Sequence, residues 1–171
     1  MNHNEPPIKN LSRSDAKLLE DAKHRILKSD YYRDISSVFE LIDGRFVKET
    51  MAGNSGYVLV FNHQLYSVAA LFENKLMLMI GTGEINQDHI DFINSPIFGD
   101  GKNPQIDLNI PYCDRYCDIA RELTYCKDKQ IDGISIGENS FNICFEDDFE
   151  LDSTLFLDKA GKLTLRVFWE K

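Results

Sequence analysis

Basic residues are scarce in the second half of this sequence. Between Glu84 and Asp158, five Lys or Arg residues stand against seventeen Asp or Glu residues, an excess of twelve negative charges. The rest of the chain holds fourteen basic and eleven acidic residues, so this stretch accounts for the formal net charge of −9. Such a charge argues against direct binding to a nucleic-acid backbone or an anionic membrane, because both repel it, and favours cationic partners.

The sequence also lacks a long uninterrupted apolar run. The first thirty residues contain no apolar core of the kind that a secretory signal needs, so we expect a cytoplasmic protein. The longest uncharged run, from Met51 to Phe72, has nearly the length of a membrane span, but polar residues from Asn54 to Ser67 interrupt it. Two strands explain this run better than one helix, and we expect no membrane association.

Nucleotide-binding and hydrolase motifs are missing. Residues 81–84, Gly-Thr-Gly-Glu, lack the third glycine of a dinucleotide fingerprint, and Glu84 would repel a phosphate. Residues 99–102, Gly-Asp-Gly-Lys, lack the alternating ligands of a calcium loop. No Gly-x-Ser-x-Gly elbow occurs. We therefore interpret both glycine pairs as turns and expect no cofactor.

The first candidates for a metal site or a nucleophile are four cysteines: Cys113, Cys117, Cys126 and Cys144. Zinc sites pair two thiolates about two to four residues apart on a turn and then repeat the pair, a spacing that this chain does not follow. A disulfide fits poorly with a cytoplasmic chain. We expect buried core thiols and no metal.

The length fits one domain, because about 170 residues bury roughly 70% of the surface of the unfolded chain without a disulfide or metal. We find no internal repeat and no linker. The expected organisation is a flexible arm over residues 1–10, which contain Pro6-Pro7, followed by a single domain over residues 11–171.

Hydrophobic periodicity predicts an α+β fold: an N-terminal helix or helix pair, a largely antiparallel meander, one further helix near residues 111–127 and a C-terminal β-meander. The first helix runs from Ser12 or Ser14 to about Lys28, and a second ends at Gly44, unless Asp43-Gly44 is a hairpin turn. We favour a helix there and a strand from Arg45. The other predicted elements are strands at 57–61, 65–72, 76–80, 133–137, 140–146, 149–157 and 163–169 and a helix at 87–93. The strands of the first meander are apolar on both faces, so we expect other parts of the chain to cover each side.

The acidic residues that remain unexplained form two groups. The first surrounds the turn between two predicted strands and comprises Glu146, Asp147, Asp148, Glu150 and Asp152, with Phe149 among them. The second recurs at every fourth residue of the predicted helix 111–127 and comprises Asp114, Asp118 and Glu122. Carboxylates with interleaved aromatic residues supply both long-range attraction and apolar anchors for a basic protein. A solvated turn explains the first group equally well, since charge also discourages edge pairing of strands.

Our functional interpretation is a non-enzymatic binding protein that uses both acidic groups to neutralise a basic protein. In size, acidity and lack of catalytic motifs, the chain resembles bacterial immunity proteins, which inhibit a cognate toxin that is often a nuclease. A mimic of nucleic-acid charge is an alternative, and the apolar strands leave room for a homodimer. A second alternative is a small hydrolase or transferase in which Asp88 or Asp91 orients His89 as a base.

Overall fold

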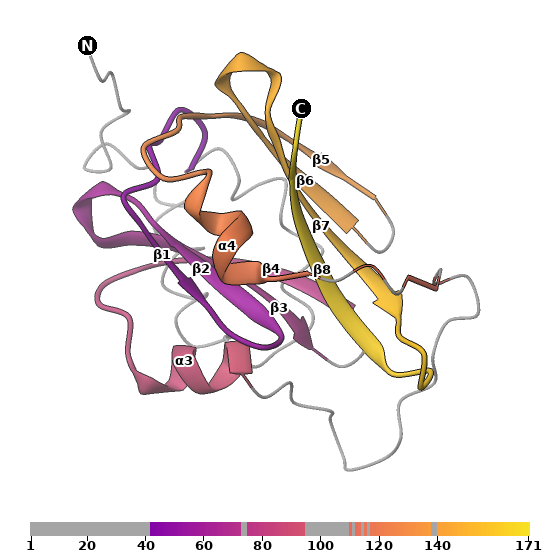
Figure 1. Cartoon of the computed structure of the whole chain (residues 1–171). Coiled ribbons are helices and arrows are strands. Elements are labelled where there is room, and N and C mark those ends of the chain that lie inside the picture. Colours follow the sequence, from indigo (N-terminus) through magenta and orange to yellow (C-terminus); the bar gives the residue numbers. More distant parts are fainter. Residues whose placement is uncertain are drawn as a thin grey trace.

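A computed structural model describes residues 42–72, 75–94, 110, 112–113, 115, 117–137 and 140–171. It contains two antiparallel sheets of four strands each and few helices, so the fold is mixed α+β and mostly β (Figure 1). The predicted arm, the predicted N-terminal helices and Asp114 lie outside the described residues. No helix within the described ranges is both long and apolar enough to cross a membrane.

The first sheet has the order β1-β2-β3-β4 and is a simple meander. Its strands are β1 (Glu49–Ala52), β2 (Gly56–Val60), β3 (Leu65–Phe72) and β4 (Lys75–Thr82), followed by α3 (Gln87–Asn94). Both faces of the sheet are buried, as the apolar runs predicted. Leu59 and Ser67 pair on the face toward the second sheet, whereas Val58, Val68 and Met79 pair on the face that α3 contacts, and all five are fully buried.

The second sheet has the order β5-β6-β7-β8 and is again a meander. Its strands are β5 (Ile131–Ile136), β6 (Ser140–Phe145), β7 (Glu150–Leu157) and β8 (Leu163–Glu170). Burial alternates along β6 and β7, so one face is apolar and inner and the other is partly exposed and outer. The predicted alternation of this part of the chain is confirmed.

The inner faces of the two sheets meet in one core. The Tyr57 hydroxyl on β2 and the Ser153 hydroxyl on β7 lie 2.6 Å apart there, and both residues are fully buried. The short helix α4 (Ile119–Thr124) packs against β1 and β8 and so covers the space between two sheet edges (Figure 1). Apolar burial between the sheets and under α4 therefore holds the halves together.

The predicted helix at 111–127 is not confirmed as a whole, because among its described residues α-helix is limited to α4. Tyr112 pairs with Leu157 as an isolated parallel bridge, and the Cys113 N–H donates to the Leu157 carbonyl at 3.1 Å. Asp118 has an extended conformation and caps α4, accepting from the Arg121 N–H at 3.2 Å. Pairing with the second sheet has thus overridden the helical spacing of the apolar residues.

The predicted strand from Arg45 also needs correction, since β1 begins only at Glu49. Residues 44–47 instead pair with residues 128–131, which lead into β5, and we call these two stretches the crossing segments. Phe46 and Gln130 form the bridge at their centre. The crossing segments therefore join the first sheet to the second through backbone hydrogen bonds.

Candidate protein-binding surface

The outer face of the second sheet carries a row of carboxylates. Glu150 and Asp152 lie on this face of β7, and Glu170 on β8 is the direct cross-strand neighbour of Glu150. The Asn142 amide on β6 donates to Glu150 Oε2 at 3.1 Å, and the Thr154 hydroxyl donates to Asp152 Oδ1 at 2.5 Å. Because side chains alternate along a strand, these acids point away from the core. Neighbouring polar groups hold two of them in place.

The turn between β6 and β7 exposes three more acids, Glu146, Asp147 and Asp148. The Phe145 N–H donates to the Phe149 carbonyl at 2.8 Å and closes this turn. Asp147 and Asp148 have φ of 66° and 65°, in the left-handed region that Asp tolerates better than most residues. The first predicted group is therefore one surface, which we call the acidic hairpin: the exposed turn plus Glu150 and Asp152.

An aromatic stack supports the base of the acidic hairpin. Phe149 stacks on Trp169 with ring centroids 5.1 Å apart and an interplanar angle of 13°. The Lys171 and Lys129 ammonium groups lie 5.0 Å and 5.9 Å from the centroid of the Phe149 ring. Both rings are half-buried. By the alternation of side chains along β7, this stack lies on the inner side of the sheet with Leu151, opposite Glu150 and Asp152, and two lysines lie at its edge.

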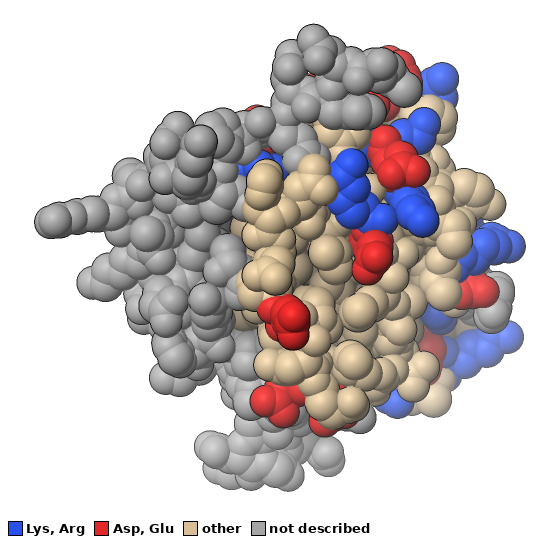
Figure 2. Space-filling model, turned by 90° about the vertical axis from the view of Figure 1, so that its left-hand side faces the viewer, with Lys and Arg blue, Asp and Glu red and all other residues tan. Residues whose placement is uncertain are grey.

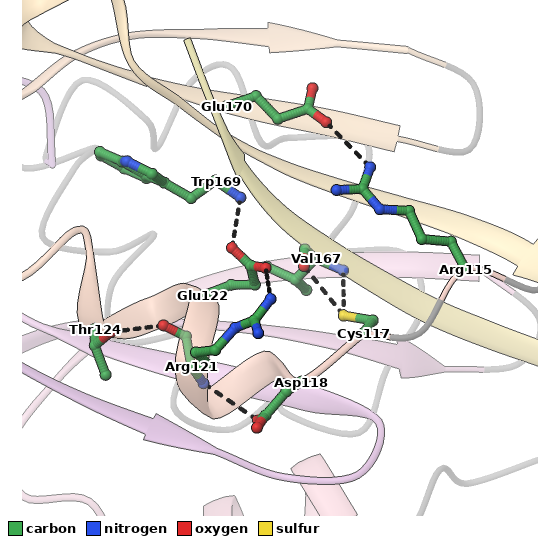
Figure 3. A network of polar contacts seen from close by, with 9 residues as sticks. All are labelled: Arg115, Cys117, Asp118, Arg121, Glu122, Thr124, Val167, Trp169 and Glu170. Atoms are coloured by element: carbon green, nitrogen blue, oxygen red, sulfur yellow. Dashed lines mark hydrogen bonds and ion pairs between the residues drawn. The ribbon is translucent and has the colours of Figure 1, made fainter.

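The second predicted group lies elsewhere, beside the free edge of β8 (Figure 3). Glu122 is only 7% exposed, and its Oε2 accepts from the Trp169 N–H at 3.1 Å. Its Oε1 accepts from Arg121 at 3.3 Å. Asp118 is occupied in capping α4. These two acids have structural partners and do not form an exposed ridge, and Asp114 lies outside the described residues.

Cys117 also protects the free edge of β8. Its thiol accepts from the Val167 N–H at 3.2 Å and donates to the Val167 carbonyl at 3.1 Å (Figure 3). Burial raises the pKa of the Cys117 thiol, which keeps the proton needed for that donation. Cys117 and Glu122 therefore satisfy edge groups that would otherwise be open to another strand. Sequence reasoning missed this role, since the partners are about fifty residues apart in the chain.

Arg115 pairs with one of the outer-face acids. Its guanidinium lies 4.1 Å from the centroid of the Phe168 ring and 3.8 Å from Glu170 Oε1. Both charged side chains are well exposed, so the ion pair adds little stability. It reduces the negative charge at the Glu170 end of the row and leaves Glu150 and Asp152 as its main carboxylates.

The cysteines show no sign of nucleophilic activation. Burial raises the pKa of Cys126 to about 12, and burial together with the nearby charges of Glu150 and Asp132 raises that of Cys144. All described cysteines are free thiols. Across the described parts of the chain, no group of three His, Cys, Asp or Glu side chains could hold a metal ion.

His89 does not have the surroundings of a catalytic base. Its Nδ1 accepts from the Asn86 N–H at 3.1 Å, so the neutral ring carries its proton on Nε2, 3.0 Å from the Tyr66 hydroxyl. Burial lowers the pKa of His89. Asp88 and Asp91 are exposed, and Asp91 accepts from Gln87 at 2.8 Å. Both ring nitrogens are thus committed to structural contacts, without a carboxylate to orient them.

A hollow of about 350 Å³ lies between the β1–β2 turn, α4 and β8. Its polar side chains come from Asn54, Asn94, Cys117, Asp118, Thr164 and Arg166, and none of its described lining residues is a histidine. It thus offers neither an activated thiol nor an imidazole.

The acidic hairpin concentrates negative charge in a short stretch of the chain. Figure 2 shows a face on which the described acidic and basic side chains are interspersed. The acidic hairpin, in contrast, has five carboxylates within seven consecutive residues. Comparisons of the chain with protein-family models, curated proteins and solved structures found no match.

Proposed function

We propose that this protein is a non-enzymatic binding protein whose acidic hairpin binds a basic protein. The observation that carries the proposal is the shared placement of its five carboxylates on the exposed turn and outer face of one β-hairpin. Inhibition of a basic bacterial toxin in the cytoplasm, the role of immunity proteins, is the function that this chemistry supports best. Asp118 and Glu122 are left out of the proposed contact surface, because their carboxylates hold α4 and β8.

The fold itself does not require acids in this turn. The β2–β3 turn, residues Asn62–Gln64, has the same form, with positive φ at its second and third residues and a 2.8 Å bond from the Phe61 N–H to the Leu65 carbonyl. Its residues, Asn62, His63 and Gln64, include no carboxylate. Because one backbone shape tolerates both sequences, the carboxylates of residues 146–148 are free to serve a partner.

The partner should present Lys or Arg side chains. Carboxylates in an interface accelerate encounter with a cationic surface and make binding sensitive to salt. Phe149 stacks on Trp169 on the inner side of the hairpin, so it supports the turn that presents the carboxylates. The burial of His89 and its two structural hydrogen bonds favour this function over hydrolysis or group transfer.

The test compares two variants that each lose four negative charges. One carries Glu146→Gln, Asp148→Asn, Glu150→Gln and Asp152→Asn, and the control carries Asp43→Asn, Glu49→Gln, Glu84→Gln and Asp88→Asn, which are exposed acids outside the second sheet. Poly-L-lysine serves as a cationic probe in two-dimensional amide NMR titrations. We expect shift changes concentrated at residues 146–152, abolished in the first variant and retained in the control. Changes of equal size around the acids of both sheets would contradict the proposal.

A further inference from the structure

The two sheets begin with the same turn. The Gly53 N–H donates to the Gly56 carbonyl at 2.9 Å and closes the β1–β2 hairpin, and the Gly137 N–H donates to the Ser140 carbonyl at 2.8 Å and closes the β5–β6 hairpin. The two residues of the second turn each stand 84 positions after those of the first. The first hairpins of the two sheets therefore correspond residue by residue at their closing bond.

The next hairpins keep the same offset. The Phe61 N–H donates to the Leu65 carbonyl, and the Phe145 N–H donates to the Phe149 carbonyl, both at 2.8 Å. These pairs are again 84 positions apart. The second and third residues of both turns have left-handed backbones, with φ of 63° and 60° at His63 and Gln64 and of 66° and 65° at Asp147 and Asp148. Strand order thus repeats between the sheets, and turn length and turn conformation repeat in their first two hairpins; the β3–β4 and β7–β8 connections differ in length.

The crossing segments show how the two halves are related. The Gly44 N–H donates to the Ile131 carbonyl at 2.9 Å, and its counterpart 84 positions on, the Asp128 N–H, donates to the Val47 carbonyl at 2.7 Å. Ile131 is the counterpart of Val47, again 84 positions on. In the first bond the donor belongs to the first half of the chain and the acceptor to the second half, and in the second bond these roles are reversed. Such an exchange of donor and acceptor is the signature of a two-fold axis.

A second pair of bonds obeys the same exchange. The Ile131 N–H donates to the Arg45 carbonyl at 2.8 Å, and the Val47 N–H donates to the Lys129 carbonyl at 3.0 Å. The bridge between Phe46 and Gln130 joins two counterparts to each other, so the axis passes through it. All four backbone hydrogen bonds are therefore consistent with one two-fold rotation that relates the two halves of the chain.

We propose that the two sheets are two copies of one structural unit, docked on each other through a self-complementary surface as the two subunits of a symmetric dimer would be. The surface consists of the crossing segments and the inner faces of both sheets, and its partner is a second copy of the unit, here supplied by the same chain. This proposal is independent of the proposed function. The copies have diverged: Gly53 and Gly137, Phe61 and Phe145, and Leu71 and Leu155 are among the few identical pairs, which explains why the sequence shows no repeat.

The core provides a direct test at four residues. Tyr57 is paired with Ala69 in the first sheet, and their counterparts Phe141 and Ser153 are paired in the second. All four are fully buried, and a hydrogen bond joins Tyr57 to Ser153 across the core. The two-fold rotation places the end of the Phe141 ring near Ala69. The double substitution Phe141→Tyr with Ala69→Ser should therefore create the symmetry-related hydrogen bond.

Urea unfolding of Phe141→Tyr, Ala69→Ser and the double variant measures that bond. We expect Phe141→Tyr alone to lower the unfolding midpoint, because it buries an unpaired hydroxyl, and the double variant to recover a large part of the loss. A double variant no more stable than Phe141→Tyr would overturn the two-fold relation. If Phe141→Tyr does not fold, failure of the double variant to restore folding would overturn the proposal in the same way.

A turn exchange gives a second test without touching the core. Residues 146–148 are replaced by Asn-His-Gln, and in a separate variant residues 62–64 by Glu-Asp-Asp. We expect both variants to keep the urea midpoint of the parent protein, whereas the control Asp147→Val with Asp148→Val lowers it, since β-branched residues avoid left-handed backbones. A clear loss of midpoint in either exchange would mean that the two hairpins are not equivalent.

Discussion

The hydroxyl of Tyr57 and that of Ser153 lie 2.6 Å apart at the centre of the core, each on a different sheet. Burial raises the pKa of Tyr57 well above its ordinary value, so the phenol remains protonated and the pair always has a proton to share. We expect Ser153→Ala to lower the free energy of unfolding by about 1–3 kcal/mol, because it leaves the buried Tyr57 hydroxyl without the hydrogen bond to Ser153. Urea unfolding followed by circular dichroism measures this change.

Ser67 is the matched control for that substitution. It lies on the same inner face of the first sheet and is fully buried, but its hydroxyl has no hydrogen-bond partner. Ser67→Ala removes an unsatisfied polar atom, so we expect the free energy of unfolding to stay constant or to rise by about 1 kcal/mol. Equal destabilisation by Ser67→Ala and Ser153→Ala would show that the hydrogen bond across the core contributes nothing specific.

Glu122 should protect the free edge of β8. Removing its carboxylate with Glu122→Ala leaves the Trp169 N–H without an acceptor, and we expect a loss of about 1–3 kcal/mol in the free energy of unfolding. An uncovered edge also pairs with other chains, so light scattering should show aggregation that increases with protein concentration.

Two controls separate the edge role of Glu122 from its charge. Glu122→Gln keeps an acceptor for the Trp169 N–H and should retain most of the stability. Arg121→Ala removes the ion pair of an arginine whose side chain is 62% exposed, and it should cost little. If Glu122→Gln were as unstable and as prone to aggregate as Glu122→Ala, the carboxylate would act through charge rather than through its contact with β8.

The free energy of unfolding should decrease at acidic pH because of His89. Its pKa is lowered in the folded protein, so the unfolded chain binds the proton more readily. The contribution of His89 is therefore complete above its ordinary pKa of about 6.5 and decreases as the pH falls toward the lower folded value. Urea midpoints between about pH 7 and pH 5 should drop more steeply for the parent protein than for His89→Gln.

His63, the exposed imidazole of the β2–β3 turn, provides a control for the loss of an imidazole. His63→Asn keeps a residue that accepts the left-handed backbone and should leave the urea midpoint at about pH 7 unchanged. A midpoint of His89→Gln that falls between about pH 7 and pH 5 as steeply as that of the parent protein would refute the assignment to His89.

Gly53 and Gly137 occupy equivalent turns but should respond differently to a methyl group. A Cβ on Gly53 would overlap the backbone carbonyl of Ile93 in α3, which already accepts from the Ser55 N–H at 2.8 Å. At Gly137 the nearest atom is the movable Ser140 hydroxyl, 2.7 Å away. We expect Gly53→Ala to lower the unfolding midpoint clearly and Gly137→Ala to change it little. The reverse order would mean that α3 is not docked on the β1–β2 turn.

The sequence predicted the strands well, because their signals are local. Seven predicted strands and the helix at 87–93 agree with β2 to β8 and α3 within two residues at each end. The alternation of apolar residues and the turn residues can be read within each segment, so these strands can be predicted without knowing the rest of the fold. The apolar character of both faces of the first meander likewise predicted its burial on both sides.

The sequence could not predict contacts that depend on distant backbone. Cys117 was assigned to a helix by its spacing, but its thiol binds Val167 on the edge of β8. Glu122 was assigned to an exposed acidic ridge, but it accepts from the N–H of Trp169. The helix assignment failed at Cys117 because contact with the edge of β8 outweighs local helix preference. Glu122 is helical in α4, but its burial depends on the packing of α4 against β8, which no local pattern reveals.

The candidate site was predicted in part. The five acidic residues between Glu146 and Asp152 lie together on one hairpin, as their closeness in sequence implied. Their aromatic support was only half visible, since Phe149 was noted but its stacking on Trp169 depends on the pairing of β7 with β8. Binding of a basic protein by this surface stays a prediction.

The most direct measurement of that claim is the salt dependence of binding to poly-L-lysine, by calorimetry at about 0.05 M and 0.3 M NaCl, where exposed charges are weakly and strongly screened. We expect the parent protein and the control variant at Asp43, Glu49, Glu84 and Asp88 to bind tightly at low salt and to lose affinity steeply at high salt. The variant neutralised at Glu146, Asp148, Glu150 and Asp152 should bind at least about tenfold more weakly at low salt, with a flatter dependence, because its steering carboxylates are gone. Equal affinity and equal salt dependence of the two variants would contradict the account.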